Sequence, residues 1–482
     1  MDWTLMLPEL IVIATAFVAM AVDLLVSERG RRAVAPLSLL GLAAAVLAAA
    51  VLPSQGALLG GRFAVDSVTQ WFKVLFLLAG FVTVILSRDL LDGTVRVRVR
   101  GVGFPGEFYT LLLFTVSGMM YLISARDLVT LYVSLELATI PLFVLAAWQR
   151  DDPRSGEAGL KYVVVGAMAS AFILYGFGLL YGLARSTDLD TIGRVVGPSP
   201  VFWLAAALVM AGVGFKLTIV PFHMWAADVY EGAPMPVTAY LSVASKATGL
   251  AFLFQVFFRV IGPHLEAWGT AVALLAAATM TLGNVVAIVQ ENIKRFMAFS
   301  AISQAGYLIM GFLTVNADSV AALVFYLLVY IVTNLTVFGA IIWYANETGR
   351  ERIQEYRGLS RTNPLMALVL MVALFSLAGI PPLSGFVGKF FLFSIASQAG
   401  FHWLVAVAAV NSTVSLYYYL RIVRQMYIEP LPSDLHHLPS SRALSTALGV
   451  LTAAVVLLGV VPHVYRAVHA SASAWHLPLF GV

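Results

Sequence analysis

Four ionisable side chains lie near the middle of long apolar stretches, where charge is rare: Glu136, Lys216, Lys246 and Lys389. A charge at the centre of a bilayer costs at least about 2.5 kcal/mol. Residues of this kind face a protein interior or water and mark ion or proton paths. The four residues, called here the Glu–Lys row, therefore predict a proton-conducting membrane protein.

The residue types in the row suit proton transfer. An amine in a low-dielectric interior releases its proton more readily than in water, and a nearby carboxylate strengthens its hold. At ~7 Å and an effective dielectric of about 20, a carboxylate and an ammonium attract each other by about 2.4 kcal/mol. Moving or neutralising Glu136 would therefore switch a neighbouring lysine between holding and releasing a proton. His223 follows Lys216 by seven residues and is a further relay candidate if the helix continues between them.

Composition indicates a membrane-embedded chain. The 482 residues are 60% hydrophobic and 11% charged, with a mean hydropathy of +0.90, whereas soluble chains carry about 25% charged residues. There is no cysteine, which excludes disulfides, iron–sulfur clusters and thiolate metal sites in this chain. The basic residues are spread over short loops, so they predict topology and no nucleic-acid partner.

The apolar runs recur with a helical period and predict an all-α polytopic membrane protein. About fourteen of them are long enough for the ~30 Å hydrocarbon core. Their predicted limits are 5–26, 35–52, 67–87, 105–123, 127–148, 159–184, 199–230, 236–260, 266–289, 296–314, 319–345, 363–398, 401–428 and 442–463.

Charge in the loops predicts the orientation. Most of the 29 Lys and Arg residues fall on alternate loops, starting with Arg29, Arg31 and Arg32 after the first run. Basic loops stay in the cytoplasm, which predicts both termini outside a bacterial inner membrane and an even number of spans.

Two of the predicted spans are broken by proline, at Pro221 and at the Pro381–Pro382 pair. Broken helices at corresponding places in two halves point to an inverted repeat with a site at its interface. The breaks lie five spans apart, so the two helices should run in opposite directions. The predicted parts are helices 1–3, a first five-helix repeat, a second inverted repeat and a C-terminal helix, over residues 1–104, 105–260, 261–428 and 429–482.

Other polar residues in the apolar runs have simpler interpretations. Lys73 lies near the outer end of its span and is expected to snorkel to the interface. The run from Tyr417 to Tyr419 is expected to form part of an interfacial aromatic belt. Asp228 and Glu231 are expected to be cap or interface charges, with proton entry as the alternative. Expected hydrogen-bond partners between helices are Asn284, Asn334 and Ser245.

Three long segments resemble the antiporter-like subunits of respiratory complex I. They are GFKLTIVPFHMWAADVYEGAPMPVTAYLSVASKATG from Gly214, NIKRFMAFSAISQAGY from Asn292, and YRGLSRTNPLMALVLMVALFSLAGIPPLSGFVGKFFLF from Tyr356. The opening LPELIVIATAFVAMAVDLL, the chain length and a lysine at 389 are similar to the N-type subunit. Gln304 departs from that type, which commonly has a histidine there, and glutamine cannot titrate.

The resemblance implies that Glu136, Lys216, Lys246 and Lys389 are the proton-relay residues of such a subunit. It also implies that the chain itself holds no cofactor, because NADH, FMN, iron–sulfur clusters and quinone belong to partner subunits. The implied partners are the other membrane subunits of the complex and the lipid bilayer. Two alternatives stay open on the sequence: a subunit of a multisubunit cation/proton antiporter, and one of a membrane-bound hydrogenase. A core with one acid and three lysines favours protons over Na⁺.

Overall fold

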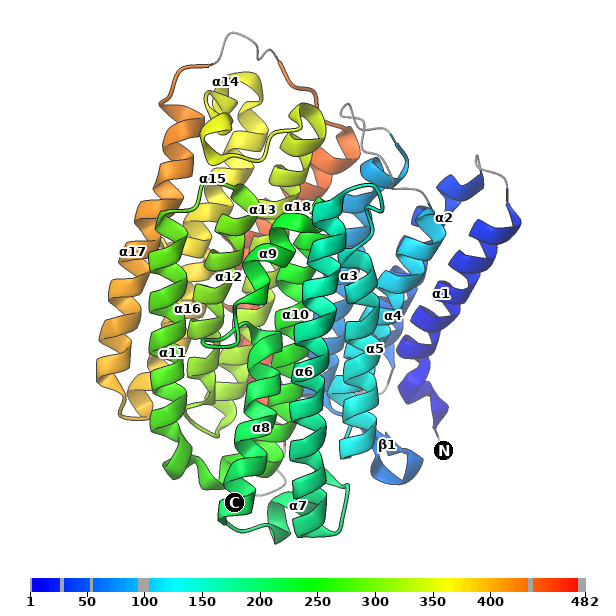
Figure 1. The fold of residues 1–482 in the computed structure, drawn as a ribbon, viewed down its shortest axis with the longest axis vertical. Coiled ribbons are helices and arrows are strands. Elements are labelled where there is room, and N and C mark those ends of the chain that lie inside the picture. The colour runs from blue at the N-terminus through cyan, green and yellow to red at the C-terminus, as the bar shows by residue number, and fades with distance from the viewer. Residues whose placement is uncertain (1, 27–29, 53–54, 94–103, 432–436, 476–482) are drawn as a thin grey trace.

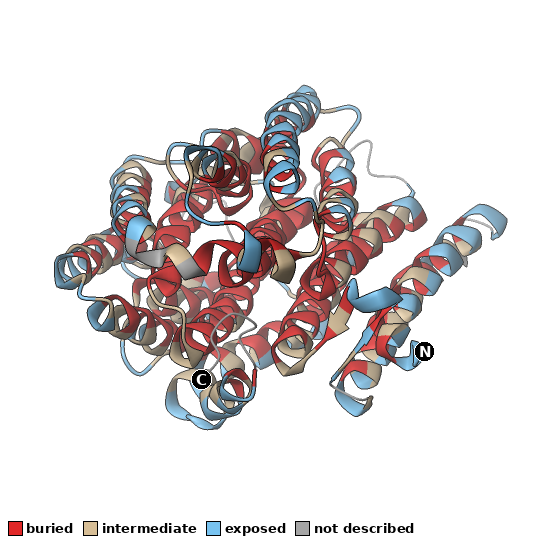
Figure 2. Cartoon of the chain, turned by 90° about the horizontal axis from the view of Figure 1, so that it is seen from below, coloured by how far each residue is buried: buried red, intermediate tan, exposed pale blue. Residues whose placement is uncertain are grey.

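The computed structural model describes residues 2–26, 30–52, 55–93, 104–431 and 437–475, and nearly all of them are helical (Figure 1). The helices run roughly parallel to one long axis and form a single bundle. Buried residues fill its middle and exposed ones its rim (Figure 2). Many rim residues are large and apolar, such as Leu160, Met168 and Tyr175 on one helix, as expected of a surface that meets lipid.

The chain begins with three long helices and a short hairpin. These elements are α1 (Leu7–Leu25), α2 (Val34–Val51), β1 (Gly56–Leu58), β2 (Phe63–Val65) and α3 (Ser67–Leu91), with the 3-10 turns Trp3–Met6, Gly30–Ala33 and Leu59–Gly61 between them. The hairpin, which the sequence analysis did not predict, pairs its strands antiparallel with Ala57 opposite Ala64. Asp66 caps α3 by accepting a hydrogen bond from the Thr69 N–H at 2.8 Å.

The first half of the bundle follows. Its helices are α4 (Pro105–Ser124), α5 (Leu128–Ala146), α6 (Pro153–Ala184), α7 (Leu189–Val195), α8 (Pro200–Leu217), α9 (Trp225–Gly232) and α10 (Met235–Val256). Side chains cap several of their N-termini, among them Asp127 on α5, Asp152 on α6 and Ser199 on α8. Helix α10 is buried over its whole length, so it forms the centre of this half.

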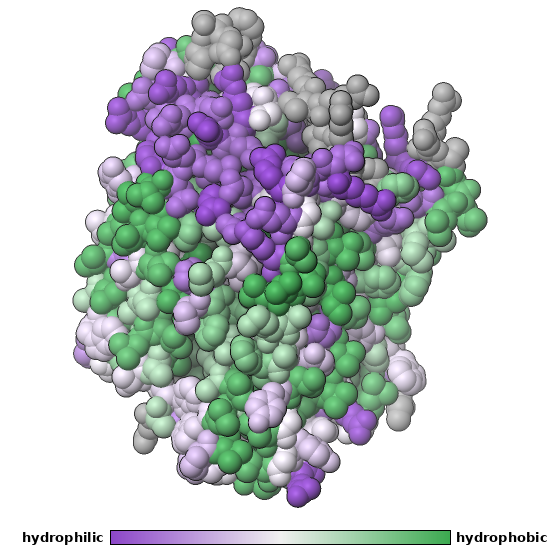
Figure 3. All heavy atoms as spheres, in the orientation of Figure 1, coloured by the Kyte–Doolittle hydropathy of each residue, from purple (hydrophilic) through white to green (hydrophobic). Residues whose placement is uncertain are grey.

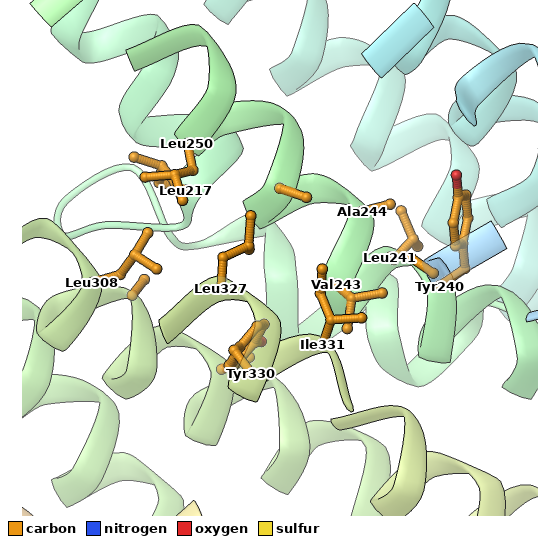
Figure 4. Packing of buried hydrophobic residues seen from close by; sticks show 14 of the residues in the cluster. Leu217, Tyr240, Leu241, Val243, Ala244, Leu250, Leu308, Leu327, Tyr330 and Ile331 are labelled. Atoms are coloured by element: carbon orange, nitrogen blue, oxygen red, sulfur yellow. The ribbon is translucent and has the colours of Figure 1, made fainter. Parts of the chain in front are cut away.

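The second half begins with a π-helical turn, η4 (Phe257–Ile261), and a 3-10 turn (Gly262–His264). Its helices are α11 (Leu265–Ile288), α12 (Ile293–Ile309), α13 (Ala317–Thr348), α14 (Leu359–Thr362), α15 (Pro364–Ala378), α16 (Ser384–Gln398), α17 (His402–Tyr427), α18 (Arg442–Val460) and α19 (His463–Ser473), with 3-10 turns at Met310–Phe312 and Ile353–Tyr356. Helix α13 packs against α10 and is almost entirely buried. Figure 4 shows Leu217, Leu250, Leu308 and Leu327 packing where α8, α10, α12 and α13 meet.

Twelve helices in the described part of the chain are long and apolar enough to cross a membrane. This finding confirms the polytopic all-α prediction. The count of fourteen spans stays a prediction, because α12, α15 and α16 have only 17, 15 and 15 residues. The inverted repeats also stay a prediction.

Both predicted helix breaks are present, and they share a local plan. Helix α8 ends before Thr218 and α15 before Gly379, and both of these residues have positive φ, 61° and 87°. Proline follows three residues later in each case, at Pro221 and Pro382. Chain direction is opposite in the two pairs, since α8 leads up to α9 and α15 leads down to α16 in Figure 1.

The two ends of the chain lie toward the same end of the bundle (Figure 1), and the C-terminal helix contacts the start of α3 there. The Trp475 indole N–H donates to Asp66 Oδ2 at 3.2 Å. Ser471 accepts the Trp71 indole N–H at 3.0 Å, and its carbonyl accepts the Ser67 hydroxyl at 3.0 Å. The last helix, α19, thus binds the start of α3. The opposite end carries most of the basic loops and is called here the arginine-rich end; hydrophilic residues gather there in Figure 3.

The snorkelling prediction for Lys73 is wrong. Its ammonium lies 2.7 Å from Glu9 Oε1, and both side chains are fully buried. The Phe63 ring lies 5.0 Å from the same nitrogen. Glu9 belongs to α1 and Lys73 to α3, so a buried ion pair joins the first and third helices.

The aromatic-belt prediction is wrong for two of its three tyrosines. Tyr417 is exposed, but Tyr418 and Tyr419 are fully buried. The Tyr418 hydroxyl donates to Asn284 Oδ1 at 2.8 Å, and the Tyr419 hydroxyl lies 2.5 Å from that of Ser300. Successive residues on a helix are about 100° apart, so a run of three cannot face one environment.

Candidate functional site: the Glu–Lys row

The Lys216 side chain reaches from α8 to α5, the helix that carries Glu136. The Lys216 ammonium donates to Thr139 Oγ1 at 2.7 Å, and Thr139 lies one helical turn after Glu136. Glu136 is half-buried between α5 and α6, where its Oε1 accepts the Ser170 hydroxyl at 2.6 Å. The row therefore begins at the edge of this subunit with an acid and continues inward to a lysine with 2% of its surface exposed.

Lys246 lies directly beside the break after α8. Its ammonium donates to Thr218 Oγ1 at 3.1 Å. The neighbouring Ser245 hydroxyl donates to the Lys216 carbonyl at 2.6 Å, and the Trp225 indole N–H donates to the Phe215 carbonyl at 3.0 Å. The Ser245 bond satisfies a carbonyl that the break leaves without a backbone partner, while the Phe215 carbonyl also accepts the Thr218 N–H at 3.2 Å. The Ser245 and Lys246 bonds also tie α10 to the end of α8, so the backbones that carry Lys216 and Lys246 are fixed relative to each other.

Lys389 satisfies the carbonyls of the second break itself. Its ammonium donates to the Leu377 carbonyl at 2.9 Å and the Ala378 carbonyl at 3.3 Å. The Tyr307 ring lies 4.4 Å from the same nitrogen. The Ser412 hydroxyl, 3.4 Å away, also donates to the Ala378 carbonyl. Lys389 is therefore held by neutral groups alone, among the residues that the structure describes.

A small cavity lies beside Lys389. Its ≈ 10 Å³ is about the space that one water molecule needs. Tyr330 and Lys389 both line this cavity, and the Tyr330 ring lies 6.0 Å from the Lys246 ammonium. Gln304 lines it too and accepts the Tyr326 hydroxyl at 2.6 Å. Gln304 also donates to the Leu377 carbonyl at 3.1 Å, which is the carbonyl that Lys389 binds.

The structure therefore places a hydroxyl beside each of the three lysines: Thr139 beside Lys216, Thr218 beside Lys246 and Ser412 beside Lys389. Sequence reasoning missed these hydroxyls and two nearby tyrosines, Tyr326 and Tyr330, because they come from distant parts of the chain. A partial signal existed for Thr139, since i and i+3 share a helix face with Glu136.

His223 has no contact with the row in the described structure. Helix α8 ends at Leu217, so the continuous helix that would place His223 on the Lys216 face does not form. His223 is half-buried in the connector to α9, and its Nδ1 has no hydrogen-bond partner among the described residues.

The other polar predictions have mixed outcomes. Asn284 joins α11 to α17 by donating to Asn411 Oδ1 at 2.9 Å, and Ser245 joins α10 to α8, as predicted. Asn334 donates only within its own helix, to the Tyr330 carbonyl at 3.4 Å, so that prediction is wrong. Asp228 and Glu231 both pair with Arg295, at 2.8 Å each, which confirms interface charges at the end of α9.

Residues 125–415 match the transmembrane family of NADH:quinone oxidoreductase and Mrp antiporter proteins. The chain belongs to this family. It is 41% identical to NADH-quinone oxidoreductase subunit N of Moorella thermoacetica over 94% of both chains. It is 40% identical to NADH-quinone oxidoreductase subunit N 2 of Rhizobium meliloti over 96% of both.

Solved structures of this family share the fold. One chain of respiratory complex I from Thermus thermophilus with bound aureothin superposes with a TM-score of 0.81 at 33% identity, covering 97% of this chain and all of that one. A chain of the Mrp complex from Dietzia sp. superposes with a TM-score of 0.82 at 22% identity, covering 98% and 97%. At that identity the likeness to the Mrp chain concerns the fold alone.

Proposed function

We propose that this chain is the N-type membrane subunit of a bacterial NADH–quinone oxidoreductase and that it moves protons along the Glu–Lys row. One observation carries the proposal: Lys216, Lys246 and Lys389 are buried and contact only neutral groups among the described residues. A buried ammonium without a counter-charge is costly, so such a lysine readily gives up its proton. Three of them in sequence can pass protons between the two halves.

The family membership and the relatives named as subunit N support the assignment to NADH–quinone oxidoreductase. In this proposal the chain binds no redox cofactor, and partner subunits carry out NADH oxidation and quinone reduction. Their chemistry acts on the row by shifting the charge or position of Glu136, which lies at the subunit's edge. The chain lies in the inner membrane with both termini outside.

The orientation has a direct test. We expect reporter tags placed after the last described residue, Trp475, and before Asp2 to score on the outer side in intact cells. The reason is that the basic loops gather at the opposite end of the bundle, and such loops stay in the cytoplasm. A fluorescent or phosphatase reporter on each terminus gives the reading, and two cytoplasmic scores would invert the topology.

The test of the function itself is a graded series at Glu136. The change Glu136→Gln keeps the shape and removes the charge, so Lys216 loses the attraction of about 2 kcal/mol that favours its protonated form. Lys216 would then stay neutral for more of the cycle and pass fewer protons. Glu136→Asp retains the charge but retracts it by one methylene. We expect NADH-driven proton uptake by vesicles to fall in the order wild type, Asp, Gln.

Two controls make this series decisive. Native gels show whether each variant assembles, and Glu157→Gln removes a carboxylate that pairs with Lys161 near the start of α6, away from the row. Full pumping by assembled Glu136→Gln would leave the acid as a structural partner only.

A further inference from the structure

A large cavity, called here the vestibule, lies at the arginine-rich end and is separate from the row. Its volume is ≈ 690 Å³. It is lined by the ends of α3 and α13, the starts of α6 and α12, and the α9–α10 junction. Its charged lining includes Asp151, Asp152, Arg154, Lys294 and Glu351. Burial raises the pKa of Asp152 and hydrogen bonds from Arg154 lower it, with a net lowering, so the vestibule holds ionised groups and attracts water.

An ion pair between a buried lysine and a partly exposed glutamate lies in the wall of the vestibule. The Lys294 ammonium is 3.2 Å from Glu351 Oε1, with only 6% of the lysine side chain exposed. The same ammonium donates to the Ala233 carbonyl, at the end of α9, at 3.4 Å. Two backbone hydrogen bonds of 2.8 Å hold the segments of Lys294 and Glu351 side by side: Ile293 N–H to Glu351 O, and Ile353 N–H to Glu291 O. The pair therefore has a fixed place where α9 gives way to α10.

Buried polar atoms without protein partners continue inward from this pair. Helix α10 begins at Met235, in the vestibule wall. Lys246 lies about 16 Å further along this helix, at 1.5 Å per residue. Beside it lie the Tyr230 hydroxyl and Asn334 Oδ1, both buried and both without a hydrogen-bond partner among the described residues. Water usually satisfies buried polar atoms of this kind. Tyr330, whose hydroxyl donates to the Ser242 carbonyl at 2.9 Å, then leads to Lys246.

The other end of α10 is closed to water. Phe254, Phe258 and Trp475 pack against one another with ring centroids 4.8–5.8 Å apart, and Phe257 and Phe312 extend this layer. Beyond the aromatic layer, Arg259 pairs with Asp190 at 2.6 Å. A buried arginine repels protons, as in other membrane pores. The aromatic layer and the Arg259–Asp190 pair therefore separate Lys246 from this end of the bundle, where Thr248 and Gln255 are further buried polar residues of α10.

We propose that the vestibule is the mouth through which protons reach Lys246, and that the Lys294–Glu351 pair is the gate across its floor. The inference rests on the proposed function and names the entry route of that site. A proton from vestibule water passes by Tyr230 and Asn334 to the neutral Lys246 amine, which becomes an ammonium. Lys294 and Glu351 act as positioning residues, because their pairing decides how far water enters.

Cysteine accessibility tests the route. The chain has no cysteine, so a thiol reagent reports only an introduced one on this subunit. We expect Asn334→Cys to react with a small, membrane-impermeant thiol reagent at least about tenfold faster than Leu335→Cys, since a thiol reacts where water and reagent reach it. Leu335 is the next residue on α13 and equally buried. Ser242→Cys, a nearly isosteric change on the facing helix, provides a second position should Asn334→Cys not assemble.

Sidedness and the gate complete the experiment. The reaction should occur in assembled complex only when the reagent is added at the arginine-rich end. Glu351→Gln should speed it by about threefold or more because Lys294 loses the charge that holds it, and Glu355→Gln should leave it unchanged. Glu355 is the matched control, since it caps the Arg352 N–H and does not line the vestibule.

The possible results separate a failure of the vestibule route from a failure of the proposed proton-pumping function. Equal rates for Asn334→Cys and Leu335→Cys, or reaction from the opposite end, would overturn the vestibule route. An unchanged rate in Glu351→Gln would overturn the gate. If labelling is as expected while Lys246→Met still pumps, the route is open to water but the proposed function is wrong.

Discussion

Replacing Lys246 by methionine should abolish proton pumping while the complex still assembles. Methionine fills nearly the same volume, and among the described residues the ammonium has one hydrogen-bond partner, the Thr218 hydroxyl at 3.1 Å, which keeps its own bond to the Leu217 carbonyl. Folding should therefore tolerate the change. A positioned proton-transfer group contributes about 10²–10⁴-fold to rate, so its removal should reduce NADH-driven proton uptake to background. Proton uptake by proteoliposomes and a native gel together measure the two effects.

The change Lys246→Arg separates a relay from a fixed positive charge. Arginine keeps the charge but does not release its proton in proteins. If Lys246 must exchange its proton, Lys246→Arg should pump as poorly as Lys246→Met. Wild-type pumping by the arginine variant would show instead that a permanent cation is enough at this position.

The second large effect is expected at the buried Glu9–Lys73 pair, and it concerns stability. Lys73→Met leaves the Glu9 carboxylate buried without its partner, and breaking such a pair costs about 3–5 kcal/mol. Replacing both partners, in Glu9→Leu combined with Lys73→Met, removes both charges and should be neutral or stabilising. We expect the single variants to lose assembled complex at a lower temperature than wild type, and the double variant to recover.

The double variant also distinguishes this lysine from those of the row. It should pump at wild-type levels, because Lys73 pairs with an acid and has no described contact with Lys216, Lys246 or Lys389. A double variant as unstable as the single ones would show that packing, and not an uncompensated charge, causes the loss. A stable double variant that does not pump would add the pair to the proton path.

The contrast between the two lysine types shows how far the sequence could predict the site. A charge within an apolar run is visible in sequence, and proline marks a helix break, so the Glu–Lys row and both breaks were predictable. The pairing of a charge is not visible, since it depends on residues far apart in the chain. Lys73 was misjudged because its partner, Glu9, lies 64 positions earlier, in a different helix. Lys389 binds the carbonyls of its own break, which no spacing rule predicts.

The hydroxyl groups beside the lysines were hidden for the same reason. Tyr330 is an ordinary residue in an apolar helix, and it matters because α13 places it at one small cavity with Lys389. The half-buried position of Glu136 was also not predictable, because burial at a subunit's edge depends on the neighbouring helix α6 and its Ser170. Sequence periodicity predicts which residues lie in helices, but tertiary packing decides what each side chain meets.

The contacts of α19 have a consequence for how the protein is made. Ser67 and Trp71 emerge from the ribosome about four hundred residues before Ser471, the residue whose carbonyl and hydroxyl accept their hydrogen bonds. Throughout synthesis the indole N–H and the hydroxyl at the start of α3 remain without these partners. A chain that stops early keeps them so, and an unpaired buried donor destabilises the structure around it. The N-terminal part of the protein thus obtains these hydrogen bonds only when the C-terminal helix α19 has been made. A product truncated before α19 is therefore destabilised at α3, far from the site of truncation in the sequence.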